Sequence, residues 1–162
     1  LDFHTSDHIS EVGYDFDPEE FAATLKKAYV NSVTVFGRCH HGYIYHDSKA
    51  FAERKHPHLK RNLLKEQIEA CHKAGIRTPV YVTVQWDYLT ARQHPEWLMR
   101  DENGAPIAFG DTNRFHPGFY NHLCVLSPYR DFLKSYIADL FEQVPVDGLF
   151  LDIHHIRPNA NE

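Results

Sequence analysis

The sequence predicts an α/β fold: a TIM (β/α)8-type barrel with only about the first four β/α units present. Segments rich in β-branched residues alternate with segments whose apolar residues recur at helical spacing. Strands that alternate with helices pair in parallel through right-handed crossovers. A full barrel takes about 250 residues, whereas this chain has 162. We therefore expect residues 1–162 to form the N-terminal half of a barrel catalytic domain.

The first part of the chain predicts a strand end, a helix and a second strand. Residues 1–4 are interpreted as the last residues of a first strand. A helix should begin after Asp17, which acts as N-cap, with Pro18 in the first position and Glu20 in the first turn. Residues 32–36 are rich in β-branched side chains and predict the second strand.

The remaining chain predicts two helices and two strands, separated by long loops. Residues 63–71 carry a helical apolar stripe that Gly75 ends, and another helix opens at Ser127-Pro128. Loops as long as residues 37–61 and 85–126 are usually functional in a compact domain. Within the second loop, residues 101–104 form a turn signal that can join two short strands. The two strands are expected over residues 78–84 and 146–153, and the last is expected to be buried on both faces.

A half barrel has unpaired strand edges and an open inner face, which affects the partners that we expect. Either a second copy of the chain or a missing C-terminal half would complete it.

The net charge of −5 argues against a nucleic-acid surface, and no apolar stretch is long enough to cross a membrane. Three cysteines without paired spacing predict reduced thiols. With no signal peptide, these features predict a cytoplasmic protein, although the first residue is Leu1 and the N-terminus is expected to be trimmed.

Polar and aromatic residues follow each expected strand at the edge where TIM barrels place their active sites. Asp152 directly follows the apolar run of the last strand and is the candidate catalytic residue. Such a rim of hydroxyl-binding groups and flat rings suits a carbohydrate substrate. The candidate substrate-binding residues are His4, His40, His41, Trp86, Asp87 and His154.

Glycoside hydrolysis needs two carboxyl groups, which in retaining enzymes lie about 5 Å apart. Asp152 is the best candidate for the nucleophile. Asp87 can serve as the acid, or a carboxylate from the missing half can. The alternative interpretations are that Asp87 is an N-cap, that Trp86 is a packing residue and that the pair His40-His41 is solvated.

Two other functions remain open from the residues alone. A metal-dependent hydrolase could gather a divalent ion at the barrel mouth, although no HExxH motif is present; its ligands would be His4, His8, His40, His41, His154 and Asp152. A non-catalytic sugar-binding module could keep the barrel half without turnover. No phosphate-binding glycine motif follows any strand, which argues against a nucleotide-binding fold. We expect no cofactor and no metal.

Several segments together resemble the α-L-fucosidase-type glycoside hydrolases and a related group of hypothetical glycosyl hydrolases. The segment 39–43 is similar to their paired-histidine motif but lacks its Asp, and residues 94–104 and 147–152 also resemble these families. The resemblance implies a TIM-barrel retaining exo-glycosidase that acts on a carbohydrate. It implies that Asp152 is the nucleophile and that His4, His40 and His41 bind substrate. The acid/base would lie beyond this chain, which could then be inactive alone.

Overall fold

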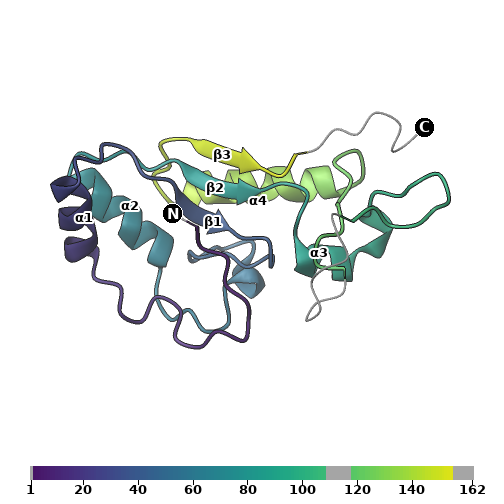
Figure 1. Cartoon of the computed structure of the whole chain (residues 1–162), viewed down its shortest axis with the longest axis horizontal. Coiled ribbons are helices and arrows are strands. Elements are labelled where there is room, and N and C mark those ends of the chain that lie inside the picture. Colours follow the sequence, from purple (N-terminus) through teal and green to yellow (C-terminus); the bar gives the residue numbers. More distant parts are fainter. Residues whose placement is uncertain (1, 109–117, 155–162) are drawn as a thin grey trace.

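The computed structural model describes residues 2–108 and 118–154, which form a parallel β-sheet with helices packed on it (Figure 1). The strands have the order β1-β2-β3 and run parallel. An α/β fold with parallel strands is therefore confirmed, as an open sheet of three strands in the described residues. In chain order the elements are α1 (Pro18–Lys27), β1 (Val35–Arg38), η1 (Ala52–Arg54), α2 (Leu63–Lys73), β2 (Val80–Thr83), α3 (Tyr88–Gln93), η2 (Pro95–Trp97), α4 (Tyr129–Gln143) and β3 (Leu149–Asp152).

The helix starts that the sequence predicts are confirmed. Asp17 caps α1, because its Oδ1 accepts hydrogen bonds from the backbone N–H groups of Glu19 and Glu20 at 2.8 and 2.9 Å. Pro18 then occupies the first turn, where its missing N–H costs nothing. Pro128 stands at the N-cap position of α4, directly before the first helical residue Tyr129. None of the helices in the described part of the chain is long and apolar enough to span a membrane.

The expected first strand is wrong for the residues that the structure describes, because residues 2–4 form no strand. A tyrosine side chain holds this segment instead of a strand ladder. The Tyr45 hydroxyl donates to the Phe3 carbonyl at 3.0 Å, and the N–H of Thr5 donates to that hydroxyl at 3.3 Å. These contacts satisfy the backbone groups that a strand would have paired.

The core lies between the sheet and the helices. Buried side chains of β1 and β2, such as Val35 and Val80, pack with Ile68 of α2 and with Tyr136 and Leu140 of α4. Figure 1 shows α4 behind β2 and β3 and shows α1 and α2 at the end where the strands begin. The strands therefore point their carboxyl ends toward the long loops.

The strand β3 is correctly predicted in place but not in burial. Phe150 and Leu151 are 51% and 43% exposed, whereas the sequence predicts a strand covered on both faces. Only β2 pairs with β3 among the described residues, but β1 at the other end of the strand order is buried throughout. The exposure of β3 therefore reflects which segments pack over it and not its place in the strand order. An apolar run alone does not show which segments cover a strand.

The second long loop contains structure that the sequence does not predict, including α3 and η2. The predicted turn at residues 101–104 is confirmed. Asp101 Oδ1 accepts hydrogen bonds from the N–H groups of Asn103 and Ala105, and Gly104 has a φ of +79°. An antiparallel bridge joins Arg100 and Pro106 across this turn.

Candidate functional site

A row of aromatic side chains crosses the sheet on the face opposite α4. Phe36, Tyr81 and Phe150 are register partners on β1, β2 and β3. The rings of Phe36 and Tyr81 stack with centroids 4.2 Å apart, and those of Tyr81 and Phe150 lie 5.9 Å apart. Side chains alternate between faces along a strand, so Asp152 shares the face of Phe150. The sheet therefore presents an aromatic floor with a carboxylate at its end.

A pocket of about 420 Å³ opens on this floor. Asp152 and His4 line it, and both are among the residues that the sequence predicts. Tyr81, Phe36 and Phe150 form its apolar part, and Asp2 and Thr34 complete it. This combination of flat rings and a few polar groups is typical of small-molecule sites.

Two hydrogen bonds orient the carboxylate of Asp152. The Tyr81 hydroxyl donates to Oδ2 at 3.0 Å, and the backbone N–H of Ile153 donates to Oδ1 at 2.8 Å. The second bond requires a turn directly after β3, where Ile153 adopts a φ of +56°. A β-branched residue in this left-handed region is strained by about 1–3 kcal/mol. The turn that directs the Ile153 N–H group at Asp152 is therefore locally strained.

His40 supports Tyr81 from the loop after β1. Its Nε2 lies 2.7 Å from the Tyr81 hydroxyl oxygen. Because the single hydroxyl proton is donated to Asp152, we infer that His40 carries its proton on Nε2 and donates it to Tyr81. Burial, together with the neighbouring His4, lowers the pKa of His40 to about 3, although the charge of Asp152 opposes the shift. A neutral imidazole, a phenol and a carboxylate therefore form one hydrogen-bonded chain.

His4 packs on His40 at the edge of the pocket. The ring centroids lie 3.9 Å apart, and the backbone N–H of His40 donates to His4 Nδ1 at 3.2 Å. His4 Nε2 faces the carboxylate of Asp2 at 3.3 Å. Burial lowers the pKa of His4, although the charges of Asp2 and Asp152 oppose the shift. The neutral His4 ring therefore borders the pocket with its Nε2 proton directed at Asp2.

Asp87 has a structural position, and its interpretation as an N-cap is confirmed. It is fully buried, caps α3 through the N–H of Thr90 at 2.9 Å, and accepts the Thr90 hydroxyl at 2.7 Å. Arg38 and Arg54 approach its carboxylate at 3.1 and 3.6 Å. No part of Asp87 is exposed to a sugar in this structure. The buried carboxylate of Asp87 therefore gives its predicted roles in substrate binding and acid catalysis no support.

The other predicted residues lie around the pocket without lining it. Trp86 is only 9% exposed, and its ring packs edge-on against His40 at 5.0 Å. The ring of His41 packs against Phe119 at 4.7 Å. His154 is exposed beyond the turn at Ile153, and His155, which follows it, lies outside the described residues.

Sequence reasoning missed the role of Tyr81. The sequence predicts a strand over residues 78–84 that contains Tyr81, and in the structure this strand is β2, which ends at Thr83. Side chains two positions apart on a strand point to the same face, so Tyr81 shares its face with Thr83 at the end of β2. That pattern could have indicated a hydroxyl directed at the neighbouring strand's carboxylate.

The residues that the structure describes contain no group of three or more His, Cys, Asp or Glu side chains that could hold a metal ion. Two of the ligands named for the metal-dependent alternative make other contacts. His4 Nδ1 accepts a backbone N–H and His40 Nε2 contacts Tyr81. The described residues therefore give the metal-dependent alternative no support.

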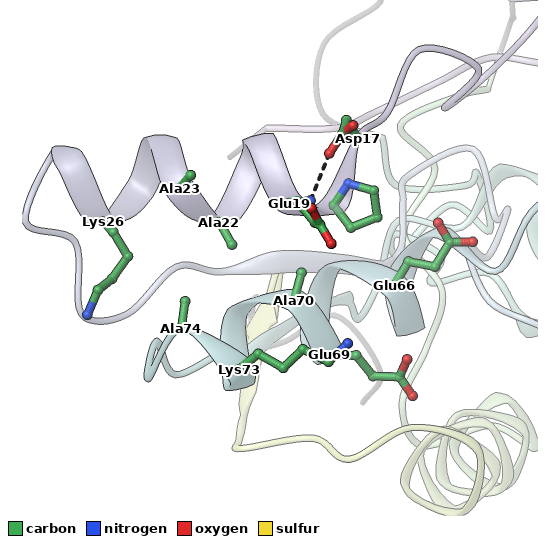
Figure 2. Close-up of a pocket in the computed structure, with 11 residues that line it drawn as sticks. Asp17, Glu19, Ala22, Ala23, Lys26, Glu66, Glu69, Ala70, Lys73 and Ala74 are labelled. Atoms are coloured by element: carbon green, nitrogen blue, oxygen red, sulfur yellow. Dashed lines mark hydrogen bonds between the residues drawn. The ribbon is translucent and has the colours of Figure 1, made fainter.

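A wider pocket, of about 600 Å³, lies between α1 and α2 and contains none of the predicted site residues. Figure 2 shows Ala22 of α1 and Ala70 of α2 pointing into the space between the two helices, with acidic and basic side chains around them. No aromatic side chain lines it. The pocket on the aromatic floor is therefore the better candidate for chemistry.

Comparison with known proteins gives one family match and several structural matches. The model of the family described as hypothetical glycosyl hydrolase 6 matches residues 17–153. No curated protein gave a match. The α-L-fucosidase isoenzyme 2 from Paenibacillus thiaminolyticus is similar at 38% identity, with a TM-score of 0.85. The match covers 97% of this chain but 23% of that enzyme, so this chain spans less than a quarter of its length.

Two more distant structures share the fold. The α-fucosidase from Thermotoga maritima in complex with fucose has 21% identity and a TM-score of 0.58, with 86% of this chain and 29% of that chain covered. A hypothetical protein from Ruminiclostridium thermocellum has 14% identity and a TM-score of 0.66, with 88% and 72% covered. The chain is therefore similar to one part of longer proteins in two of these three matches.

Proposed function

Because the chain belongs to the hypothetical glycosyl hydrolase 6 family, we propose that it forms the nucleophile-bearing part of a retaining glycosidase barrel. The proposed substrate is an α-L-fucoside or a related terminal sugar, as the name of the Paenibacillus enzyme suggests. The single observation that carries the proposal is the carboxylate of Asp152. It lies at the carboxyl end of β3, lines the pocket on the aromatic floor, and is held by two hydrogen bonds.

Asp152 is the proposed nucleophile. In the retaining mechanism, one carboxylate oxygen attacks the anomeric carbon while an acid protonates the leaving oxygen, and water then releases the sugar from the enzyme. The two hydrogen bonds to Asp152 fix the direction of its oxygens and leave further lone pairs on both. A carboxylate held in this way is oriented for attack before the substrate arrives.

Tyr81 is the proposed positioning residue. Burial and the hydrogen bond to Asp152 raise the pKa of its phenol, so it remains protonated and keeps donating. The donated hydrogen bond holds Oδ2 through the reaction and weakens as that carboxylate loses its charge on forming the glycosyl ester. Tyr81 in turn is held by His40 and by stacking on Phe36.

The acid/base is proposed to come from residues outside the described part of the chain. Asp87 is enclosed by two arginines, and the side chain of Asp2 is largely exposed beside His4. The proposed barrel would supply its further strands along β3, where Phe150 and Leu151 are exposed. Substrate turnover then depends on that further part being present.

The experiment is an assay with aryl α-L-fucosides and other aryl glycosides, on the wild type and on Asp152→Asn, with the solution mass measured alongside. We expect turnover with a fucoside at the full natural length of the protein, and a loss of more than about 10²-fold in the variant. Sugar binding without turnover, unchanged in Asp152→Asn, would instead favour the non-catalytic module.

A further inference from the structure

A pocket of about 360 Å³ lies between the loop that precedes α1 and the segment that precedes α2. Residues 10–14, 57–58 and 60–61 contribute its walls, and it shares no lining residue with the pocket of Asp152. Its volume falls within the range of about 300–1,000 Å³ that ligand pockets occupy. Neither the family match nor the proposed chemistry at Asp152 accounts for it.

An exposed aromatic ring stands in this pocket. Tyr14 lines it and is 72% exposed. The turn that carries Tyr14 is held in place, because its N–H donates to the Glu11 carbonyl at 3.0 Å. Glu11 has a φ of +56° and Gly13 a φ of +72°, so the turn departs from the backbone that most side chains prefer. Strain of this kind persists only where the surroundings fix the conformation.

Arg61, on the opposite wall of the pocket, fixes the conformation of the turn that carries Tyr14. Its Nη1 donates to the carbonyls of Gly13 and Phe16 at 3.1 and 2.6 Å. Its guanidinium lies over the Phe16 ring, 5.2 Å from the centroid, and it pairs with Glu66 on the far side. The charge of Arg61 is therefore already balanced. The ring of Tyr14 is thus presented on a rigid turn, which lowers the entropy cost of binding a ligand against it.

The charged side chains that line the pocket have opposite signs, so together they favour neither an anion nor a cation. Lys60, Glu11 and His58 line it, and all three side chains are exposed. Within residues 2–108 and 118–154, no ion pair involves Lys60 or Glu11. One ammonium and one carboxylate offer donors and acceptors while their charges offset each other. Such a set suits adjacent hydroxyl groups better than a phosphate, sulfate or carboxylate.

We propose that this pocket is an accessory binding site for a neutral pyranose, separate from the site at Asp152. One C–H face of the sugar packs on the Tyr14 ring, while Lys60 and Glu11 hydrogen-bond to its hydroxyl groups. Tyrosine is suited to this role because its ring is apolar and rigid and its edge is polar. The site would hold a carbohydrate chain on the surface without taking part in its cleavage.

The test maps binding by NMR on the ¹⁵N-labelled chain with three probes: L-fucose, methyl β-D-galactopyranoside and galacturonic acid. We expect the amides of Glu11, Gly13 and Tyr14 to shift with at least one neutral sugar, and galacturonic acid to bind no more tightly. Binding at these amides should be independent of salt, since exposed charges are screened but neutral contacts are not. Shifts confined to the surroundings of Tyr81, or none at the three amides with any probe, would overturn the proposal.

Matched variants separate this site from the catalytic one. Tyr14→Ala should raise the Kd for the sugar, measured from the amide shifts, about tenfold, as expected for loss of an aromatic contact. Tyr29→Ala, at a position 96% exposed and outside the pocket, should leave this Kd unchanged. Both side chains are exposed, so the two variants should keep the wild-type spectrum elsewhere. Asp152→Asn should leave this binding unchanged even if the chain has no glycosidase activity. Equal binding by Tyr14→Ala and the wild type would contradict the proposal.

Discussion

Replacing Asp87 with Asn should destabilise the chain by about 3–5 kcal/mol, the loss typical when one partner of a buried ion pair is removed. Asp87 is fully buried, and its carboxylate neutralises Arg38 at 3.1 Å and Arg54 at 3.6 Å. The Asn side chain still offers an oxygen to the N–H of Thr90, so this variant removes the charge and keeps the cap. Asp87→Ala removes both and should cost about 1 kcal/mol more.

The assay is urea unfolding followed by tryptophan fluorescence, with the free energy of unfolding extrapolated to water. The matched control is Asp47→Asn, whose carboxylate pairs with Lys55 at 2.6 Å on the surface. That pair is shorter than the pair of Arg38 with Asp87, yet its loss should cost at most about 1 kcal/mol because water screens it. If Asp87→Asn cost no more than Asp47→Asn, the structural role of Asp87 would be refuted.

Three further predictions concern pH, the tyrosine and metals. Burial lowers the pKa of His46 from 6.5 to about 4, so the unfolded chain binds the proton first and stability is lost as the pH falls from 6.5 toward 4. His46→Phe should flatten this part of a pH series of urea midpoints, and an unchanged slope would contradict the prediction. Tyr81→Phe should lower kcat about 10- to 100-fold, the effect of a hydrogen bond to a charged group, with little change in the urea midpoint; unchanged kcat would exclude positioning by the hydroxyl. Dialysis against a chelator should leave glycosidase activity intact, and stoichiometric zinc in purified protein would favour the metal-dependent alternative.

Local signals in the sequence predict much of the fold. The cap at Asp17 with Pro18 and the turn at Gly104 depend on residues only a few positions apart, and the structure confirms both. The burial of β3 depends instead on which distant segments pack over it, and Phe150 shows that an apolar run does not contain this information. The segment that precedes Thr5 lies outside the sheet because the Tyr45 hydroxyl, 40 residues away, holds it.

The sequence predicts the residues of the candidate site whose position depends on where a strand ends. It does not predict those whose exposure depends on packing between distant segments. Asp152 follows an apolar run and lines the pocket on the aromatic floor. Asp87 also follows a strand, but two arginines from distant segments enclose it. A sequence in which Arg38 and Arg54 stand 16 positions apart gives no sign that both would meet this carboxylate. Tyr81 was overlooked because its hydroxyl acts across two strands, which only the register reveals.

The most direct test of the central claim is covalent trapping of Asp152 with 2-deoxy-2-fluoro-α-L-fucosyl fluoride. Fluoride leaves with little help from an acid, so the reaction tests the nucleophile independently of the acid/base. The account predicts one fluorofucosyl adduct by mass spectrometry, located on the peptide that contains Asp152 and absent from Asp152→Asn. An adduct on another residue, or an equal adduct in Asp152→Asn, would contradict it.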